Sequence, residues 1–276
     1  MRLLMTVFYS TILVHLRVCH VYPHSSEFSV TFRSRKSPQE CDKLARNGKR
    51  HRWVLRNLRM SFLRNQSMKL VIFGATGTVG CQVVQQALEQ GHIVKAFVRN
   101  LSKVNMRHPQ LSFIQGDVMD SSTVEQAIQG QDAVICVLGS GKKLKSTIRS
   151  EGTQQIIQAM EKVGVRRLIC QSTLGTGETW DNLNFYWKYV MFGFILRQVF
   201  VDHERQEELV RTSNLDWTIV RPSAFVDGPR TGQYRHSFPS TERNITLKIS
   251  RADVADFILK QLSDQSSFHQ SPSLSY

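Results

Sequence analysis

The stretch MKLVIFGATGTVG, residues 68–80, decides the fold that we expect for this 276-residue chain. Its first part, Lys69–Phe73, is a short apolar run typical of a buried strand. The residues that follow, Thr78–Gln90, place apolar side chains at helical spacing. Three glycines stand between the two segments: Gly74, Gly77 and Gly80. A glycine turn between a strand and a helix is the context expected of a dinucleotide-binding fingerprint.

The chemistry of such a turn is that of the backbone. Glycine permits the tight turn and lets the chain approach a pyrophosphate without a Cβ atom in between. The free N–H groups at the start of the next helix, together with the helix dipole, favour an anion. The predicted phosphate-binding residues are Gly74, Thr76, Gly77, Thr78, Val79 and Gly80. The simpler alternative is a glycine-rich turn that holds no ligand.

The end of the second predicted strand, His92–Val98, indicates which dinucleotide binds. Domains that prefer NAD usually place an acidic residue there, about 20 residues beyond the turn, to hold the ribose 2′-hydroxyl. Here Arg99 and Asn100 follow the strand instead. Arg99 can make charge-assisted hydrogen bonds with a 2′-phosphate, and Ser102 and Lys103 can assist. We therefore predict NADP(H) in preference to NAD(H), the alternative being that Arg99 is an ordinary solvated side chain.

Strands and helices alternate through the rest of the body. Further strands are predicted over residues 111–115, 132–138, 167–170 and 215–220, and further helices over 123–128 and 147–163. This alternation implies right-handed crossovers and a parallel sheet covered on both faces. We therefore predict the α/β class, with a doubly wound parallel sheet of the Rossmann type. It should form one domain over residues 68–264, followed by a C-terminal tail over 265–276.

Two segments interrupt the alternation, and both follow the carboxyl ends of strands. Leu174–Leu196 is rich in aromatic residues, and Ser223–Leu247 is irregular and polar. In open α/β sheets the ligand binds beyond these strand ends. We expect a small elaboration that builds the substrate pocket. For the aromatic segment, packing over the sheet or forming a dimer face is equally consistent with the sequence.

The net charge of +14 lies mostly in residues 1–67, a leader with 13 Lys and Arg against 3 Asp and Glu. The body is only mildly basic, so we expect no nucleic-acid partner. The apolar run Leu3–Val14 is shorter than the roughly 20 residues that span a bilayer, so we expect no transmembrane span. The leader has the composition of a transit peptide, of sequence translated upstream of a true start at Met60 or Met68, or of a basic arm with its own partner. The expected location is cytoplasmic, or an organelle if the leader is a transit peptide.

The five cysteines, Cys19, Cys41, Cys81, Cys136 and Cys170, form no CxxC pair. The last three fall within apolar helix or strand patterns, so we expect them to be small core side chains in a reducing compartment. No residues have the spacing of a metal site, and no metal is expected.

The glycine turn and Val98-Arg99-Asn100 resemble those of the atypical short-chain dehydrogenase/reductases, in particular the NmrA-like proteins and the biliverdin/flavin reductases. Later runs are also similar to that branch: Gly116-Asp117-Val118, Val137-Leu138-Gly139, Asp202-His203, residues 216–222 and residues 250–255. The resemblance covers residues 68–263. It favours this branch without fixing a substrate.

The resemblance implies a set of further cofactor contacts. Asp117 and Val118 would contact the adenine, and Leu138 and Gly139 would lie beside the ribose. Pro222 would border the nicotinamide.

The chain departs from the family in the residues that exchange protons. Typical short-chain dehydrogenases use a YxxxK pair, in which the lysine lowers the pKa of the tyrosine. Here Tyr186 is followed four residues later by Val190, and Tyr189 by Gly193, so the pair is missing.

Candidate polar groups remain at the end of the fifth predicted strand. The hydroxyls of Ser172 and Thr173 could hydrogen-bond a substrate carbonyl or the nicotinamide, although both residues could simply cap the turn. His203 could donate a proton, but a helix-surface histidine with no role is the simpler expectation.

Two functions follow from these observations. The first is an NADPH-dependent reductase that passes hydride to a small conjugated acceptor such as a flavin, quinone or tetrapyrrole, which can take its proton from solvent. The aromatic segment could stack on such an acceptor. The alternative is a non-catalytic NADP(H)-binding redox sensor of the NmrA type. A nucleotide-sugar epimerase or dehydratase is disfavoured because it also needs the tyrosine and lysine. The sequence leaves the acceptor and the oligomeric state open.

Overall fold

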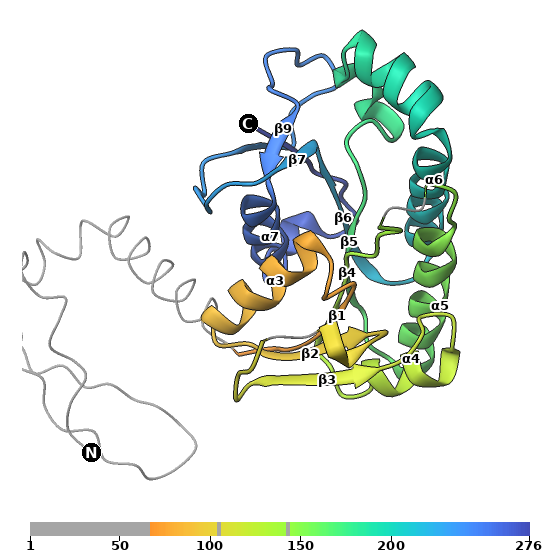
Figure 1. The fold of residues 1–276 in the computed structure, drawn as a ribbon, viewed down its shortest axis with the longest axis vertical. Helices are drawn as coiled ribbons and strands as arrows, with labels where there is room; N and C mark the ends of the chain where they lie inside the picture. Colours follow the sequence, from red (N-terminus) through yellow and green to blue (C-terminus); the bar gives the residue numbers. More distant parts are fainter. Residues whose placement is uncertain (1–66, 104–105, 142–143) are drawn as a thin grey trace, which may run out of the picture. The chain divides into compact units, whose positions relative to one another are not determined.

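The computed structural model of the protein describes residues 67–276 with the exception of 104–105 and 142–143. The leader as far as residue 66 therefore lies outside the described residues, together with Met60, Cys19 and Cys41. The described chain forms a mostly parallel sheet between two layers of helices (Figure 1).

The main sheet contains eight strands in the order β3-β2-β1-β4-β5-β6-β10-β8. They are β1 (Lys69–Phe73), β2 (Ile93–Val98), β3 (Leu111–Gln115), β4 (Ala133–Cys136), β5 (Arg167–Gln171), β6 (Asp216–Pro222), β8 (Arg235–His236) and β10 (Ser273–Ser275). Every neighbouring pair is parallel except β10 and β8. A separate parallel pair joins β7 (Ala224–Val226) to β9 (Lys248–Ser250). The strand order reverses between β1 and β4, and ligands of open α/β sheets bind at such a switch point.

Within the described part of the chain, five α-helices cover the two faces of the sheet. α3 (Thr78–Glu89) and α7 (Arg251–Lys260) pack on one face, and α4 (Ser121–Ile128), α5 (Ile148–Val163) and α6 (Arg197–Thr212) pack on the other (Figure 1). Shorter helices are η1 (Leu101–Lys103), η2 (Gly177–Asn182), η4 (Gln265–Ser267) and the π-helix η3 (Tyr186–Ile195). The predicted doubly wound Rossmann-type sheet is confirmed.

The central strands alternate their side chains between two cores, as the pleat of a strand requires. Leu70 and Ile72 of β1 enter the core under α3 and α7, whereas Val71 and Phe73 enter the core under the other three helices. All four side chains are fully buried. The apolar run that opens the domain is therefore shared by both layers.

No helix in the described part of the chain is long and apolar enough to cross a membrane.

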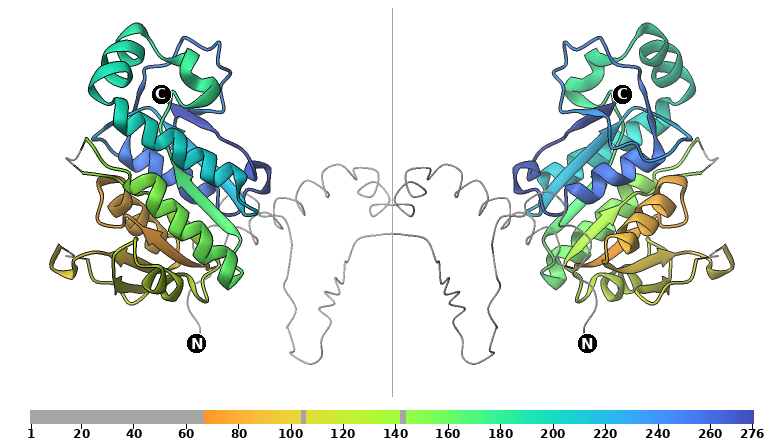
Figure 2. Two further views of the ribbon diagram at one scale, coloured as in Figure 1. Left: turned by 90° about the vertical axis from the view of Figure 1, so that its right-hand side faces the viewer. Right: turned by 90° about the vertical axis from the view of Figure 1, so that its left-hand side faces the viewer.

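The two segments that interrupt the alternation have a small core of their own. Its buried residues are Leu174, Leu183, Phe192, Phe200, Phe238 and Leu247. Figure 2 shows this part of the chain gathered at one end of the sheet. Of the aromatic segment, Phe192 is buried in this core and Trp180 and Trp187 pack against it, so these three side chains are structural.

The C-terminal tail expected over 265–276 is instead part of the sheet. Strand β10 lies between β6 and β8, and Leu274 is fully buried. The Tyr276 hydroxyl donates to Asp253 Oδ2 at 2.6 Å and accepts from Ser250 N at 3.2 Å. The expectation was wrong because a three-residue strand is too short to show a period of two, and its pairing partners are distant in sequence.

We expect Leu274→Ala to lower the free energy of unfolding by about 2–4 kcal/mol, because it deletes a fully buried side chain and leaves a cavity. Chemical denaturation without added nucleotide measures this. Met119→Ala, at a side chain that is 44% exposed, is the control and should change stability by less than about 0.5 kcal/mol. Equal effects of the two substitutions would show that β10 contributes nothing.

Candidate functional site

The glycine turn after β1 brings backbone segments closer together than side chains allow. Gly74 has a φ of +85°, and a Cβ atom on it would lie 2.4 Å from the carbonyl oxygen of Val137. A Cβ atom on Gly80 would lie 2.1 Å from the carbonyl oxygen of Gly74. Both distances are far below van der Waals contact. These two positions therefore require glycine, and they seat the start of α3 directly against the ends of β1 and β4.

The amides at the start of α3 face solvent without competition from side chains. Gly77 is the N-cap residue, it makes no side-chain capping bond, and the first turn contains no acidic residue. Thr76, Gly77 and Thr78 are exposed, whereas the side chain of Val79 is 5% exposed, so Val79 can offer only its backbone N–H. Unused helix amides with flanking hydroxyls fit the diphosphate of a dinucleotide.

Arg99 lies where the sequence analysis placed it, directly after β2. Its side chain is exposed and forms no hydrogen bond or ion pair with any described residue, while its carbonyl oxygen accepts from Gln115 Nε2 at 3.3 Å. Asn100 Oδ1 accepts from Ser102 N at 2.8 Å and turns the chain into η1. The backbone of Lys103 ends this short helix, but its side chain lies outside what the structure describes. The end of β2 therefore presents a guanidinium and no carboxylate.

The residues predicted to flank the adenosine meet at the ends of β3 and β4. Asp117 is exposed, and its Oδ1 accepts from Met119 N at 3.0 Å, so part of its acceptor capacity stabilises its own turn. Val118 is 3% exposed, Leu138 is half-buried and Gly139 is exposed.

Gly152 of α5 explains how these strand ends come together. A Cβ atom on it would lie 2.8 Å from Leu138 Cδ1 and 3.0 Å from Val118 Cγ1. The absence of a side chain lets α5 approach both residues. The sequence alone did not single out Gly152. A glycine inside a helix indicates that another segment packs close to the helix, but it does not indicate which segment.

Polar atoms without partners gather at the ends of β5 and β6. Gln171 Oε1, Ser172 Oγ and Ser223 Oγ are buried and make no hydrogen bond with a described residue. The backbone places these residues at the ends of neighbouring strands, because Gln171 pairs with Val220 and Ser172 N donates to the carbonyl oxygen of Val220 at 2.8 Å. As consecutive residues, Gln171 and Ser172 point to opposite faces of the sheet. Such atoms are uncommon in native proteins and indicate a missing ligand or water. This edge therefore fits the carboxamide end of a nicotinamide nucleotide.

Thr173 and Pro222 border the same place. Thr173 is half-buried, and its hydroxyl makes only a long contact of 3.4 Å with the carbonyl oxygen of Leu174. Pro222 is buried, and its carbonyl oxygen accepts from Leu174 N at 2.8 Å. The structure thus brings together all the described residues that the sequence analysis assigned to the nicotinamide end.

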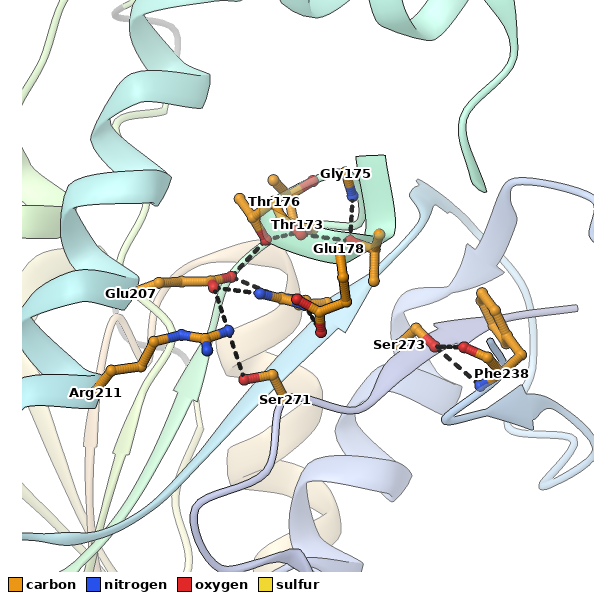
Figure 3. Close-up of polar contacts among 11 residues, drawn as sticks. Thr173, Gly175, Thr176, Glu178, Glu207, Arg211, Phe238, Ser271 and Ser273 are labelled. Carbon is orange, nitrogen blue, oxygen red and sulfur yellow. Dashed lines mark hydrogen bonds and ion pairs between the residues drawn. The ribbon is translucent and has the colours of Figure 1, made fainter. Parts of the chain in front are cut away.

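A buried ion pair beneath these residues was not predicted. The Arg221 side chain is inaccessible to solvent, and its Nε and Nη2 donate to the two oxygens of Glu207 at 3.0 and 2.7 Å. Its Nη1 donates to Glu178 Oε1 at 2.6 Å. Figure 3 shows Glu207 surrounded by Thr176, which donates to it at 2.5 Å, and by Arg211 at 3.3 Å. The network ties the loop after β5 to β6 and α6.

The negative charge of Glu207 is neutralised by Arg221, and both of its carboxylate oxygens accept hydrogen bonds within this network. Burial by itself would raise the pKa of Glu207, but the hydrogen bonds and charge of Arg221 outweigh burial, and the hydroxyl of Thr176 adds to their effect. The pKa of Glu207 is therefore below its ordinary value. A carboxylate held ionised in this way is not a proton donor at neutral pH.

The neighbouring residues of α6 have a structural role. Asp202 is 2% exposed and accepts from Arg149 N at 3.2 Å, from Ser150 N at 3.1 Å and from Ser150 Oγ at 2.6 Å, so it caps the start of α5. His203 is only 7% exposed, which corrects the expectation of a helix-surface histidine. Burial, together with the charge of Arg149, lowers the pKa of His203 to about 3. The imidazole is therefore neutral at neutral pH.

The described residues contain no cluster of three or more His, Cys, Asp or Glu side chains that could hold a metal ion. Cys136 and Cys170 are buried as expected. Cys81 is exposed, so the expectation of a core side chain was wrong at this position. It lies on the solvent side of α3, where the apolar residues around it had suggested burial.

We expect the buried His203 to make folding sensitive to acid. Because its pKa is about 3 in the folded state and near 6.5 in the unfolded chain, protons favour unfolding as the pH falls from 6.5 toward 3. The loss from this residue should approach about 1.4 kcal/mol per pH unit within that window. His203→Gln should flatten the pH dependence of the unfolding free energy measured in urea. The control is His236→Gln on an exposed strand. An unchanged slope for His203→Gln would contradict the assignment.

Comparisons with known proteins agree with this geometry. The sequence pattern of a family described as NAD(P)H-binding matches residues 74–265. The chain is 30% identical over 205 residues to the UPF0659 protein YMR090W of Saccharomyces cerevisiae, covering 71% of this chain and 87% of that protein. It is 29% identical over 171 residues to the photosystem II assembly factor Ycf39 of Synechocystis sp., covering 60% of this chain and only 48% of that protein.

Solved structures show the same fold. The anaerobillin reductase ChuY from Escherichia coli O157:H7 is 26% identical, with a TM-score of 0.61, covering 75% of this chain and 96% of that one. The oxidoreductase ylbE from Lactococcus lactis is 24% identical, with a TM-score of 0.64, covering 75% and 90%. The resemblance to atypical short-chain dehydrogenase/reductases is thereby confirmed. Since the family pattern covers well over half of the chain, this protein belongs to the NAD(P)H-binding family.

Proposed function

We propose that the protein is an NADPH-dependent oxidoreductase that transfers hydride to a flat conjugated acceptor such as a flavin, quinone or tetrapyrrole. The observation that carries the proposal is the contrast between the two ends of the site. Among the residues that the structure describes, one end has helix amides without a capping side chain and a guanidinium without an ion-pair partner, and the other has buried uncharged polar atoms without partners. The first combination suits a phosphorylated nucleotide, and the second suits a neutral carboxamide.

The residues at the first end would hold the nucleotide by charge and backbone donors. The amides of Thr78 and Val79 would donate to the diphosphate, assisted by the hydroxyls of Thr76 and Thr78. The N–H of Gly77 already donates to the carbonyl oxygen of Gly74 at 2.9 Å, so Gly77 would contribute the close approach of its backbone. Arg99 would bind the 2′-phosphate, because a guanidinium makes paired, charge-assisted hydrogen bonds with phosphate oxygens.

The residues at the second end would orient the ring. Ser172 and Thr173 would offer hydroxyls, and Pro222 would limit the space beside the nicotinamide. When bound, NADPH supplies the hydride. The described part of the chain brings no free acid or base to these strand ends. Its contribution is therefore to orient the nicotinamide ring and the acceptor and to exclude water.

Because the described residues offer no proton donor near the nicotinamide end, the class of acceptor is restricted. The tyrosine–lysine pair is missing from the sequence, His203 is buried and neutral, and Glu207 is held ionised by Arg221. An acceptor that spreads its new charge over a conjugated system can take a proton from water, whereas a simple ketone cannot do so easily. The similarity to an anaerobillin reductase supports an acceptor of this conjugated class.

A redox sensor is the second candidate function, and the same missing acid–base pair favours it. Such a protein would bind NADP(H) through the same residues and act through a partner without turnover. Nucleotide binding alone does not distinguish it from the reductase, so the two candidates separate only in an assay of NADPH oxidation.

We expect Arg99→Ala to weaken NADPH binding at least tenfold in calorimetry and to leave NADH binding almost unchanged, because only NADPH loses a charge-assisted contact worth about 1.5–3 kcal/mol. Arg166→Ala is the control, since this exposed arginine precedes β5 at the amino ends of the strands, whereas Arg99 follows the carboxyl end of β2. An equal loss for both nucleotides would refute the role of Arg99.

We expect the full chain to oxidise NADPH with at least one member of a panel of flavins, quinones and linear tetrapyrroles. Ser172→Ala should lower kcat about fivefold, the effect of losing roughly 1 kcal/mol from one hydrogen bond. Thr212→Ala, an exposed hydroxyl at the end of α6, should have no effect. Tight NADPH binding without oxidation of the nucleotide by any member of the panel would favour the sensor.

A further inference from the structure

We propose that one end of the domain docks on an anionic membrane surface through an aromatic ridge and a basic groove. The aromatic ridge consists of Phe185, Tyr186, Tyr189, Val190, Phe194 and Ile195. The basic groove is formed by Lys145, Arg197 and Arg205. This inference does not depend on the redox chemistry proposed above.

The aromatic ridge is the one place in the described residues where large apolar side chains are exposed next to one another. The exposed fractions are 73% for Phe185, 53% for Tyr186, 59% for Tyr189 and 85% for Phe194. The other exposed large apolar side chains among the described residues, Ile93, Leu101, Met119 and Leu144, come from four separate segments. Scattered apolar side chains are normal on a surface, but a contiguous patch marks an interaction site.

The helix geometry explains why this face points outward. In a π-helix the hydrogen bonds join residues five apart, as in the 2.6 Å bond from Leu196 N to the carbonyl oxygen of Met191. Residues four or five apart therefore share a face, which places Phe185, Tyr189 and Phe194 on the outer side. The rings of Phe185 and Tyr189 lie 4.9 Å apart.

The opposite face of the same helix is already packed. Phe192 lies 5.6 Å from the Trp187 ring and 4.8 Å from the Phe200 ring, within the small core of the elaboration. The domain therefore cannot bury the aromatic ridge by rotating the helix, because rotation would expose this core instead. Figures 1 and 2 show the segment at the far end of the elaboration, away from the sheet.

The basic groove begins where the aromatic ridge ends. It is a cavity of about 520 Å³ at the starts of α5 and α6, and Lys145, Arg197 and Arg205 contribute its cations. None of the three forms an ion pair with a described residue. Its one carboxylate, Asp202, is buried and used to cap α5.

The charges of the aromatic ridge and the basic groove indicate which kind of partner binds them. Residues 184–198 contain no Asp or Glu, so neither the aromatic ridge nor the start of α6 adds a negative charge. A symmetric dimer through the aromatic ridge would bring two basic grooves toward each other, which costs electrostatic energy. An anionic bilayer satisfies both features, since aromatic side chains favour the headgroup region and lysine and arginine bind acidic headgroups.

The test compares variants of the full chain in sedimentation with vesicles of phosphatidylcholine, alone or mixed with phosphatidylglycerol. We expect binding to the mixed vesicles and little to pure phosphatidylcholine. The double variant Phe185→Ser/Phe194→Ser and the double variant Arg197→Glu/Arg205→Glu should each weaken binding at least about tenfold. The matched controls are Ile93→Ser/Met119→Ser and Arg107→Glu/Arg166→Glu, which make the same kinds of change at exposed positions elsewhere.

Every variant keeps the basic leader, so a difference between variants reports on the folded domain. Unchanged NADPH affinity in calorimetry shows that a variant is folded and that the test is separate from the proposed redox function. Equal binding of all variants would overturn the proposal, because the leader alone would then account for the affinity. A wild-type dimer in light scattering that becomes a monomer in the Phe185→Ser/Phe194→Ser variant, with vesicle binding unchanged, would also overturn it.

Discussion

The buried pair of Arg221 and Glu207 constrains the half of the site where chemistry would occur. A guanidinium removed from water is tolerated only when its donors are satisfied, and removing its partner would leave an uncompensated charge in the interior. Glu207 belongs to α6, Arg221 to β6, and Glu178 to the loop after β5, so satisfying one side chain fixes three segments. Ser172 and Thr173 begin that loop. Their positions therefore follow from an ion pair that does not itself face the ligand.

The other half of the site is made by local backbone geometry. The turn after β1 needs no partner from elsewhere in the chain except the carbonyl oxygen of Val137, against which Gly74 packs. The first-turn amides of α3, those of Thr78 and Val79, have no side-chain acceptor because Gly77 provides no cap. The two halves of the site therefore place different demands on the sequence. The turn needs only a few glycines, whereas the other half depends on matched side chains from segments far apart in the sequence.

The same division explains what the sequence could predict. The alternation of strands and helices, the glycine turn and Arg99 at the end of β2 are local signals, and the fold that they predict is confirmed. Three features depend on contacts between distant segments, and no local pattern reports them. His203 was expected on the surface because nothing in α6 shows that α5 covers it. Strand β10 was expected to be a tail because its neighbours β6 and β8 lie some tens of residues earlier. Arg221 lay in a run noted only for its resemblance, and its partner Glu207 is on another element.

The charge distribution links these observations to the proposed chemistry. At the nucleotide end an unpaired guanidinium is available for an anion, whereas at the nicotinamide end the charges of Arg221 and Glu207 are already matched to each other. A neutral surrounding suits hydride transfer, because it neither stabilises a charged proton donor nor attracts water to the reacting atoms. Selection of the nucleotide and orientation of the acceptor are thus separate tasks, carried out by different segments. The proposed acceptor would be bounded by residues 174–196 and 223–247, which follow the carboxyl ends of β5 and β6 and consist largely of loops and short elements. Substitutions within these two segments should therefore change the acceptor while leaving the glycine turn able to hold the nucleotide.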